Sequence, residues 1–245
     1  MTIANRIVAV TGAGRGIGRA TALHLASRGV CLVLGARSET EIAAVAAEIE
    51  AAGGHAAFQR VDVTRRADLD GLVGLARDRF GRLDAIVNNA GVGPISRFDA
   101  LRVEDWEAMI DINLKGALYG IAAALPLFRT QGNGHVVNVV STAGLKIVPT
   151  MGVYAATKNA LRTATEALRQ ECVPGLRVTE VSPGFIDTTF VDDSITDPAV
   201  RDAINRRKRE LAISPDAVAR AIAFALEQPA DVEIGSIVVR PTAQD

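Results

Sequence analysis

The stretch R-I-V-A-V-T-G-A-G-R-G-I-G, residues 6–18, joins a short apolar run to a glycine-rich turn. Residues 6–10 are typical of a strand buried on both faces, and residues 19–28, closed by Gly29, have a helical pattern. A glycine turn at such a junction brings backbone N–H groups and the positive end of a helix close to a pyrophosphate. The stretch therefore predicts dinucleotide binding; the alternative is that the glycines serve only to pack the strand tightly on the helix.

The glycines of this turn have a spacing of their own. Ile17 stands where G-x-G-x-x-G would place its last glycine, whereas Gly12, Gly16 and Gly18 fit G-x-x-x-G-x-G. Glycine is needed where the backbone approaches a ligand closely or takes a positive φ. A glycine motif by itself is weak evidence, but its place between the first strand and first helix of an α/β chain is a strong indication of a dinucleotide site.

The end of the second expected strand indicates which dinucleotide binds. NAD sites carry an acid there, about 20 residues after the glycines, to hold the ribose 2′-hydroxyl. Here residues 35–37 read Gly-Ala-Arg, and Arg15 supplies a second guanidinium from within the glycine turn. Guanidinium groups suit a 2′-phosphate, although Arg15 or Arg37 taken singly also fits a solvated loop. The two arginines and the missing acid together predict NADP(H) as the cofactor.

Apolar runs alternate with helical patterns along the rest of the chain, without a linker or a repeat. We expect further strands near residues 30–34, 58–63, 83–87, 135–140, 177–181 and 234–239, and helices near 38–52, 67–80, 103–128, 154–172 and 214–227. This alternation predicts an α/β protein with one domain, residues 1–245: a Rossmann-type, doubly wound parallel sheet of about seven strands with helices on both faces. Residues 185–211 are mixed in charge and weakly patterned, and we expect them to form a substrate lid.

Composition excludes several classes of protein. The chain has 245 residues, of which 49% are hydrophobic and 22% charged, so it can build a substantial core. A net charge of −1 gives no overall attraction to nucleic acid or to an anionic membrane. The basic run 206–209 is followed by Glu210, as on the solvated face of a helix.

Cysteine and histidine usage gives no indication of a metal. Cys31 and Cys172 lack a C-x-x-C partner, and the three histidines are isolated from one another, so we expect no metal site and a reducing compartment. The N-terminus lacks the features of a signal peptide, and the longest apolar run, residues 116–128, is too short to span a bilayer. We therefore expect a soluble, cytoplasmic protein that binds neither nucleic acid nor membranes.

Candidate catalytic groups lie between Ser141 and Lys158. Tyr154 and Lys158 are four residues apart, which places both side chains on one face of a helix, and Ser141 lies thirteen residues before the tyrosine. A nearby ammonium favours the phenolate and lowers the pKa of a phenol from its usual ~10. The pair therefore suits acid/base chemistry, although any exposed amphipathic helix can supply Y-x-x-x-K.

Six motifs occur in the order, and at about the spacing, of one known family. They are T-G-x-x-x-G-x-G at residues 11–18, N-N-A-G at 88–91, Asn113 within I-N-L-K-G, Ser141, Y-x-x-x-K at Tyr154 and Lys158, and P-G at Pro183 and Gly184. Through these motifs the chain resembles the short-chain dehydrogenase/reductase family over nearly its whole length. The resemblance implies the strand order 3-2-1-4-5-6-7 and a dinucleotide lying across the C-terminal edge of the sheet.

The resemblance also implies catalytic roles. Tyr154 looks like the general acid that protonates a carbonyl oxygen in reduction, or the base that takes the hydroxyl proton in oxidation. Lys158 would lower the pKa of Tyr154 and hold the nicotinamide ribose, and Ser141 would hydrogen-bond the substrate oxygen. Asn113 is similar to the family residue that holds a water linking Lys158 to solvent. The nicotinamide would carry the hydride.

Cofactor contacts follow from the same resemblance and from the arginines. Asp62 and Val63 resemble the family's adenine contacts; Asn88, Ala90 and Gly91 would pack beside the adenosine ribose; and Ile186 and Thr188 would meet the carboxamide. The full expected set is Gly12, Arg15, Gly16, Ile17, Gly18, Arg37, Asp62, Val63, Asn88, Ala90, Gly91, Tyr154, Lys158, Pro183, Gly184, Ile186 and Thr188.

The last expected strand departs from the family pattern. It ends I-V-V-R-P-T, residues 237–242, where V-D-G-G is more usual, and so looks like a subgroup of NADP-dependent carbonyl reductases. Residues 93–95, 145–151 and 185–190 should form the substrate pocket, and their apolar side chains favour an uncharged ketone, aldehyde or secondary alcohol. Lys146 would select an anionic group if it pointed inward, but we expect it to be solvated.

We therefore expect an oxidoreductase that transfers a hydride between NADP(H) and a carbonyl or secondary alcohol substrate. The alternatives are an NAD-dependent alcohol dehydrogenase of the same family, or a non-catalytic protein that senses NADP(H). The helices before Pro126 and after Tyr154 are rich in small residues that allow close packing between subunits. Because family members commonly assemble in this way, the resemblance implies a homotetramer.

Overall fold

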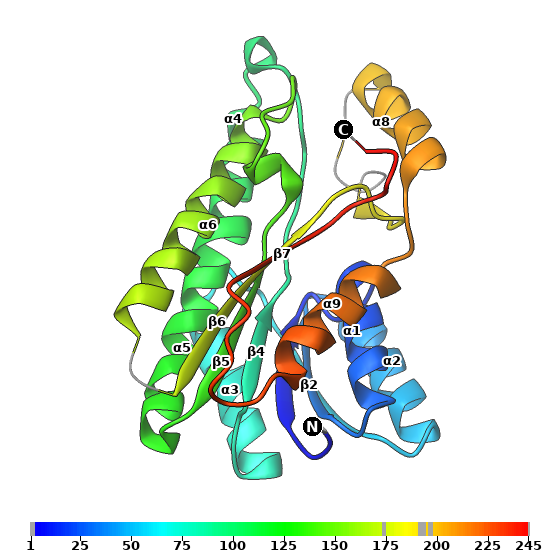
Figure 1. Ribbon diagram of the computed structural model, residues 1–245. Helices are drawn as coiled ribbons and strands as arrows, with labels where there is room; N and C mark the ends of the chain where they lie inside the picture. Colours follow the sequence, from blue (N-terminus) through cyan, green and yellow to red (C-terminus); the bar gives the residue numbers. More distant parts are fainter. Residues whose placement is uncertain (1–2, 173–174, 191–194, 196–197, 245) are drawn as a thin grey trace.

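Seven parallel strands form one sheet in the order β3-β2-β1-β4-β5-β6-β7, the order that the family resemblance implies. The structure is a computed structural model that describes residues 3–172, 175–190, 195 and 198–244. The strands are β1 (Ile7–Thr11), β2 (Cys31–Ala36), β3 (His55–Arg60), β4 (Ala85–Asn88), β5 (Gly134–Val139), β6 (Leu176–Pro183) and β7 (Ser236–Val239). Helices cover both faces of this sheet (Figure 1), so the fold is the predicted Rossmann-type layered sheet.

The helices divide between the two faces. In Figure 1, α1, α2 and α9 lie on one side of the sheet, and α3, α5 and α6 lie on the other. The α-helices are α1 (Gly16–Ala26), α2 (Glu39–Ala51), α3 (Arg66–Phe80), α4 (Val103–Met109), α5 (Gly116–Gln131), α6 (Gly152–Glu171), α8 (Pro198–Leu211) and α9 (Asp216–Glu227). Shorter turns are η1 (Phe98–Ala100), the π-helical η2 (Ile110–Lys115) and η3 (Thr142–Gly144).

Each face of the sheet has its own core, because successive side chains of a strand point to opposite faces. Val8 and Val10 of β1 pack in the cluster that includes residues of α1, α2 and α9. Ile7 and Ala9 of the same strand pack in the cluster that includes residues of α3 and α5. This double burial explains why β1 reads as a continuous apolar run.

Between β1 and β4 the order in which the chain adds strands to the sheet reverses, from one edge to the other. β1 pairs with β2 on one side and with β4 on the other, so the connections leave toward opposite edges and open a crevice between them. Thr11 holds the two strand ends together: its Oγ1 accepts hydrogen bonds from the backbone N of Asn89 at 3.0 Å and of Ala90 at 3.1 Å. The predicted motifs 11–18 and 88–91 therefore meet at this crevice.

Two elements differ from the sequence prediction. The third strand was expected at 58–63, but β3 spans His55–Arg60, because residues 31–36 of β2 pair with residues 55–60. The backbone N of Val61 still donates to Ala36 O at 2.9 Å, and the chain then leaves the sheet toward the crevice. Residues 198–211 form the helix α8 within a segment that is only weakly patterned in sequence. The role of residues 185–211 as a lid stays a prediction.

The helical stretch Val103–Gln131 is longer than the apolar run expected at 116–128. It has 29 residues, and the mean hydropathy of its most apolar window is 1.3, so by length and composition alone it could cross a membrane. However, 44% of that window is buried inside the protein. Ala124 and Phe128 lie in the core between α5 and the sheet, and core helices of this kind satisfy the same two criteria.

Candidate active site

A cavity of about 800 Å³ lies at the C-terminal edge of the sheet. The segments that follow the strands line it, together with α8 and the C-terminal tail. It brings together most of the residues selected from the sequence: Gly12, Arg15, Gly16, Ile17, Arg37, Asp62, Val63, Ala90, Gly91, Ser141, Tyr154, Lys158, Pro183, Gly184, Ile186 and Thr188. Gly18, Asn88 and Asn113 are not among the residues that line it.

The glycine turn combines an open backbone with tight packing. Gly12 and Gly16 line the cavity with φ of +64° and +54°, values that disfavour any residue with a Cβ. A Cβ on Gly18 would lie 2.2 Å from the carbonyl oxygen of Gly12, so Gly18 serves the packing of α1 on the turn. The turn therefore leaves room for a ligand at Gly12 and Gly16, and it packs against the start of α1 at Gly18.

One end of the cavity carries the two arginines. Arg37 follows β2 and is exposed, and Arg15 donates a hydrogen bond to Thr189 Oγ1 at 3.4 Å. Asp62 faces the same end. Burial opposes its ionisation, but hydrogen bonds from Thr64 N at 3.0 Å and Oγ1 at 2.8 Å, with the nearby charge of Arg37, lower its pKa overall. Described residues at the end of β2 include no acid that could replace Arg37.

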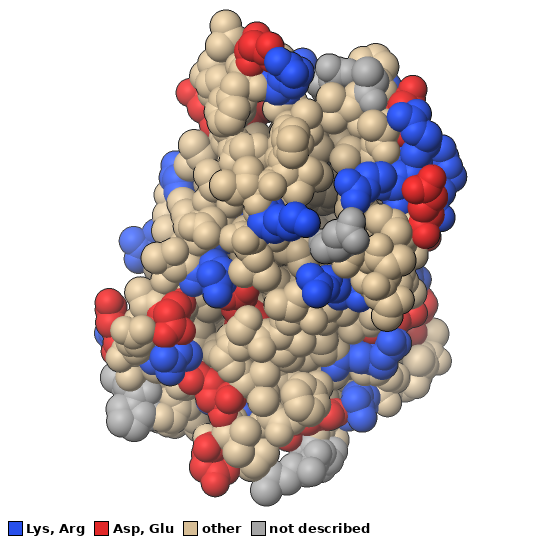
Figure 2. Space-filling model, turned by 45° about the horizontal axis from the view of Figure 1, so that its top comes forward, with Lys and Arg blue, Asp and Glu red and all other residues tan. Residues whose placement is uncertain are grey.

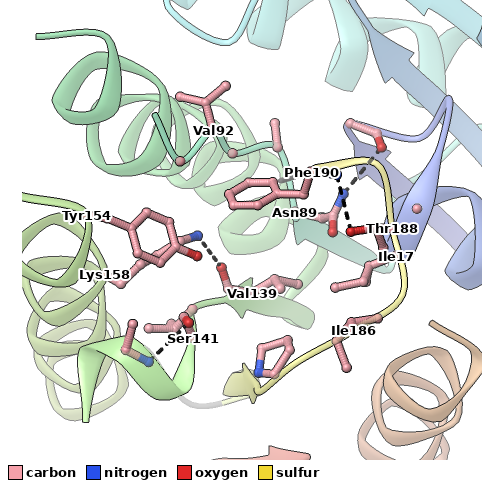
Figure 3. Close-up of a pocket in the computed structure, with 18 of the residues that line it drawn as sticks. Ile17, Asn89, Val92, Val139, Ser141, Tyr154, Lys158, Ile186, Thr188 and Phe190 are labelled. Carbon is pink, nitrogen blue, oxygen red and sulfur yellow. Dashed lines mark hydrogen bonds between the residues drawn. The ribbon is translucent and has the colours of Figure 1, made fainter. Parts of the chain in front are cut away.

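The other end of the cavity carries Tyr154 and Lys158 on α6 and Ser141 after β5 (Figure 3). Lys158 is 4% exposed, and its Nζ donates to Val139 O at 3.0 Å and lies 6.0 Å from the centre of the Tyr154 ring. Burial lowers the pKa of Lys158 to about 8. The ammonium is therefore directed at a backbone carbonyl beside the phenol.

The pKa of Tyr154 is shifted in the direction opposite to the sequence expectation. Burial raises this pKa, and a hydrogen bond with Ser141 opposes the rise. The net direction differs from the expected lowering because desolvation of the phenol is the largest cause, while the Lys158 ammonium is directed at Val139 O. Ser141 is itself oriented by its own turn, since its Oγ accepts from Ala143 N at 3.1 Å.

Asn113 lies in the π-helical turn η2, a distortion that often marks functional sites. Its Oδ1 accepts from Val92 N at 2.8 Å, and its Nδ2 donates to Val92 O at 2.9 Å and Thr157 Oγ1 at 3.2 Å. A Cβ on Gly91 would lie 3.2 Å from Asn113 Oδ1 and 3.5 Å from Lys158 Nζ. Gly91 therefore lies beside both the Asn113 amide and the Lys158 ammonium.

The two asparagines of N-N-A-G have different places. Asn88 is buried beneath the cavity, where its Nδ2 donates to Asn138 Oδ1 at 2.8 Å. Asn89 lines the cavity, and its Nδ2 donates to Thr11 O at 2.9 Å and Gly12 O at 3.3 Å. Asn89 is thus a site residue that the sequence reasoning missed. The sequence did carry a signal for this, because consecutive side chains at the end of a strand point to opposite faces, so Asn88 and Asn89 are not expected to face the same side.

The wall opposite Tyr154 comes from the segment after β6. Figure 3 shows Ile17, Ile186 and Thr188 across the cavity from Tyr154, with Phe190 between the two sides. The rings of Phe190 and Tyr154 are tilted, with centres 5.9 Å apart. Arg207, Lys208, Arg240 and Gln244 also line the cavity. Arg207 and Lys208 lie in the segment expected to form a lid but were not selected as site residues. The sequence reasoning missed Arg240 and Gln244, because the C-terminal tail reaches the site only through the fold.

The sequence is similar to those of known oxidoreductases. Residues 6–199 match the family described as short chain dehydrogenase. The chain is 43% identical to an uncharacterized oxidoreductase of Listeria monocytogenes, over 100% of this chain and 99% of that protein. An uncharacterized oxidoreductase of Staphylococcus aureus is 36% identical over 98% of both chains. The chain belongs to the short-chain dehydrogenase/reductase family, and it is an oxidoreductase of that family.

Solved structures give the same fold with nucleotides bound. An alcohol dehydrogenase from the archaeon Thermococcus sibiricus, complexed with 5-hydroxy-NADP, is 30% identical over 98% of each chain, with a TM-score of 0.87. A short chain dehydrogenase/reductase from Burkholderia phymatum in complex with NAD is 27% identical over 97% of this chain and 90% of that one, with a TM-score of 0.89. Dinucleotides with and without the 2′-phosphate thus occur among the structural neighbours.

Proposed function

We propose that this protein is an NADP(H)-dependent reductase of a carbonyl compound, or the corresponding dehydrogenase of a secondary alcohol, with Tyr154 as general acid or base. One observation supports this proposal above all: a single cavity joins the glycine turn, with Arg15 and Arg37, to Ser141, Tyr154 and Lys158. The residues fit a nicotinamide dinucleotide, because Gly12 and Gly16 leave the backbone open and a buried ammonium lies at the far end.

The proposed chemistry divides between protein and cofactor. When bound, the nicotinamide supplies the hydride that reaches the carbonyl carbon. Tyr154 gives its proton to the carbonyl oxygen, and the Ser141 hydroxyl hydrogen-bonds that oxygen as negative charge develops. Because burial raises the pKa of Tyr154, the phenol holds its proton at neutral pH. This protonation state supplies the proton that reduction consumes.

The first prediction concerns the choice of nucleotide. We expect the protein to bind NADPH more tightly than NADH, because Arg15 and Arg37 can hold the 2′-phosphate and no described acid replaces them at the end of β2. Replacing both arginines by alanine should raise the Kd of NADPH by about 10- to 100-fold, the cost of a lost charge-assisted hydrogen bond, and leave that of NADH within about 3-fold. Fluorescence titration measures both constants.

The exposed Arg66, which pairs with Asp70 on α3, gives a matched control. Arg66→Ala removes one charge from α3, outside the cavity lining, and should leave both dissociation constants unchanged. A wild-type preference for NADH would contradict the proposed role of Arg15 and Arg37 and favour the NAD-dependent alternative.

The second prediction tests catalysis itself. Tyr154→Phe keeps the ring against Phe190 and removes the proton donor, so kcat for NADPH-linked ketone reduction should fall by about 100- to 10,000-fold. The Kd of NADPH should stay within about 3-fold of the wild type, because the phenol oxygen is a small part of the binding surface. Turnover that survives this substitution would contradict the mechanism. Tight NADPH binding without turnover of any ketone by the wild type would favour the sensor alternative.

A further inference from the structure

The substrate half of the cavity, formed by lining residues from 141–151, 185–190 and 204–244, has an uneven charge. Its cations are Lys146, Arg207, Lys208 and Arg240. Among the described lining residues, the carboxylates are Glu41 and Asp62, which belong to the half near Arg15 and Arg37. Figure 2 shows Lys and Arg side chains on several sides of the hollow in the middle of this face.

Local ion pairs account for only one of these cations. Lys208 Nζ donates to Thr188 O at 2.5 Å and lies 3.4 Å from Asp187 Oδ1, so the Asp187 carboxylate offsets its charge. In the part of the chain that the structure describes, no carboxylate pairs with Arg207, Arg240 or Lys146. The guanidinium of Arg207 instead lies over the ring of Phe185, 5.5 Å from its centre. This stacking holds a charged fork at the cavity wall without neutralising it.

Both arginines lie beside the turn that ends β6. The backbone N of Gly184 donates to Val239 O at 2.8 Å, and a Cβ on Gly184 would lie 2.9 Å from the Cβ of Arg240. Arg240 and Arg207 therefore flank Gly184 and Phe185, one from the C-terminal tail and one from α8.

The same tail connects this turn to the reactive end of the cavity. Gln244 Oε1 accepts from Phe185 N at 2.9 Å, and Gln244 Nε2 donates to Thr142 Oγ1 at 3.3 Å, next to Ser141. The two arginines thus belong to the half of the cavity that contains Ser141, away from the glycine turn.

We propose that Arg207 and Arg240 form a subsite for a carboxylate of the substrate, an assignment that rests on the reductase function proposed above. The preferred substrates are then oxo acids, or hydroxy acids in the reverse direction. An arginine stays charged at any physiological pH, and its planar fork matches a carboxylate. Both arginines are exposed, so a carboxylate can reach them from solvent, and Ile204 and Val238 line the same wall beside them. The carboxylate itself gains and loses no bond in the reaction.

The test compares acids with neutral compounds of the same skeleton. NADPH-linked reduction is measured for a panel of 2-oxo and 3-oxo acids, each beside its methyl ester. The proteins are the wild type, Arg207→Ala, Arg240→Ala, the double variant, and Arg206→Ala, which removes a charge from the exposed face of α8 outside the cavity lining. Calorimetry of the NADP+-loaded proteins gives the Kd of each acid and ester without turnover.

We expect kcat/KM of the wild type to be about 10-fold or more higher for acids than for esters. The double variant should lower the value for acids by about 10-fold or more and change that for esters by less than about 3-fold, whereas Arg206→Ala changes neither. Equal values for acids and esters would overturn the subsite and leave the proposed reductase intact. A raised Kd for NADPH in place of an acid-specific loss would also overturn it, because the arginines would then serve the cofactor phosphates.

If neither acids nor esters are turned over, the reductase function is contradicted, and the calorimetric Kd values decide the subsite alone. Tighter binding of acids than of esters, lost in the double variant, would support it. Equal or absent binding of acids would overturn it.

Discussion

Burial determines the state of Lys158. Its side chain is 4% exposed and makes one hydrogen bond, to Val139 O, so the ammonium has lost most of its hydration. Burial lowers its pKa from 10.5 to about 8. Because the folded state binds this proton less tightly than the unfolded chain, the contribution of Lys158 to the free energy of unfolding rises with pH between about 8 and 10.5. Below about pH 8 the charged lysine destabilises the fold.

Lys158→Met should therefore stabilise the protein while abolishing turnover. The pKa shift corresponds to a cost of up to about 3 kcal/mol at neutral pH, and leaving Val139 O unpaired returns about 1 kcal/mol of it. We expect the free energy of unfolding at pH 7 to rise by about 1–2 kcal/mol. Urea denaturation at pH 7 and near pH 10 measures this gain, which should shrink at the higher pH.

The control for this substitution is Lys115→Met, which removes an exposed ammonium that pairs with Asp111 at 2.8 Å. It should change stability by less than about 0.5 kcal/mol and show no gain with falling pH. If Lys158→Met is less stable than the wild type at pH 7, burial of the ammonium is not the dominant effect.

At the scale of elements, the C-terminal tail after β7 is part of the site. Residues 240–244 lie against the turn at Gly184, where a Cβ would come within 2.1 Å of Gln244 Oε1. Through its two hydrogen bonds, Gln244 joins the turn after β6 to η3, the turn that begins after Ser141. The tail therefore positions two segments that belong to opposite walls of the substrate pocket.

Gln244→Ala should lower kcat/KM for ketone reduction by about 10-fold, because Ser141 and the turn after β6 lose their common support. A loss mainly in kcat with little change in the Kd of NADPH would mark a positioning residue, whereas a purely structural residue would change only the thermal midpoint. Gln244→Glu keeps the acceptor for Phe185 N and removes the donor to Thr142, so an intermediate loss is expected.

Gln228→Ala is the matched control for the tail. Its amide donates to Phe224 O at 2.7 Å on the surface of α9, away from the cavity. Activity equal to wild type in both Gln244 variants would show that the tail does not position the site.

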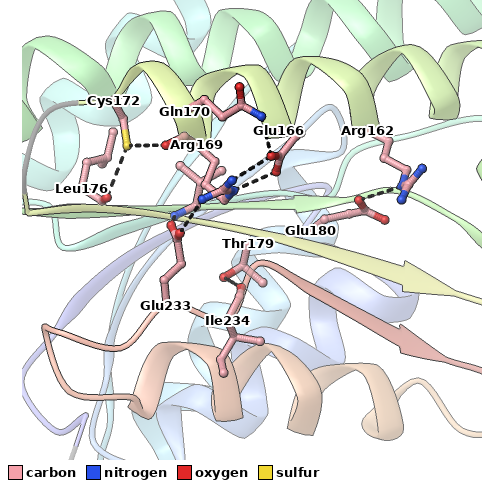
Figure 4. A network of polar contacts seen from close by, with 11 residues as sticks. Arg162, Glu166, Arg169, Gln170, Cys172, Leu176, Thr179, Glu180, Glu233 and Ile234 are labelled. Carbon is pink, nitrogen blue, oxygen red and sulfur yellow. Dashed lines mark hydrogen bonds and ion pairs between the residues drawn. The ribbon is translucent and has the colours of Figure 1, made fainter.

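At the scale of the whole molecule, side chains tie α6 to the far edge of the sheet. Figure 4 shows Arg169 between Glu166 and Glu233, and Arg162 beside Glu180. The exposed pair of Arg169 and Glu166 adds little stability. Glu233 matters more, because its Oε1 accepts from the backbone N of Val178 at 2.7 Å and so fixes the loop before β7 on β6.

His135, at the start of β5, makes this edge sensitive to acid. Thr179 donates its hydroxyl proton to Ile234 O at 2.7 Å, so it accepts from His135 Nε2 at 2.8 Å. The Nδ1 of His135 is buried and has no hydrogen-bond partner among the residues that the structure describes, so a second proton there would be unsatisfied. Burial, with the nearby charge of Arg177, lowers the pKa of His135 to about 3.

The stability contributed by His135 should be complete above about pH 6.5 and decrease as the pH falls toward 3, because the unfolded chain takes up the proton first. Between neutral pH and about pH 5 the loss should be about 2 kcal/mol. His135→Gln keeps a donor for Thr179 and cannot titrate, so its free energy of unfolding should fall less over this range. Urea denaturation measures the slope, and His55→Gln, at an exposed site, should retain the wild-type slope. Equal slopes for the wild type and His135→Gln would contradict this assignment.

Much of the fold was predictable because its signals are local. The apolar run of β1, the glycines after it and the caps of the helices are properties of a few consecutive residues, and they gave the correct alternation of strands and helices. The strand order came from the resemblance to the family. β3 was placed three residues too late, because Val61 and Val63 alternate like strand residues but face the crevice. The homotetramer and the cytoplasmic location stay predictions.

The sequence by itself determined which groups carry the candidate chemistry: the glycine turn follows from residue type and spacing, and Ser141, Tyr154 and Lys158 follow from their spacing together with the resemblance of the motifs to the family. Only the tertiary structure decided their states and their neighbours. It raised the pKa of Tyr154 and directed Lys158 to Val139. It placed Asn89, and not Asn88, in the cavity lining, and it brought Arg207, Arg240 and Gln244 to the substrate end. The physical reason is that burial, charge and hydrogen bonding act through space, between segments that lie far apart along the chain.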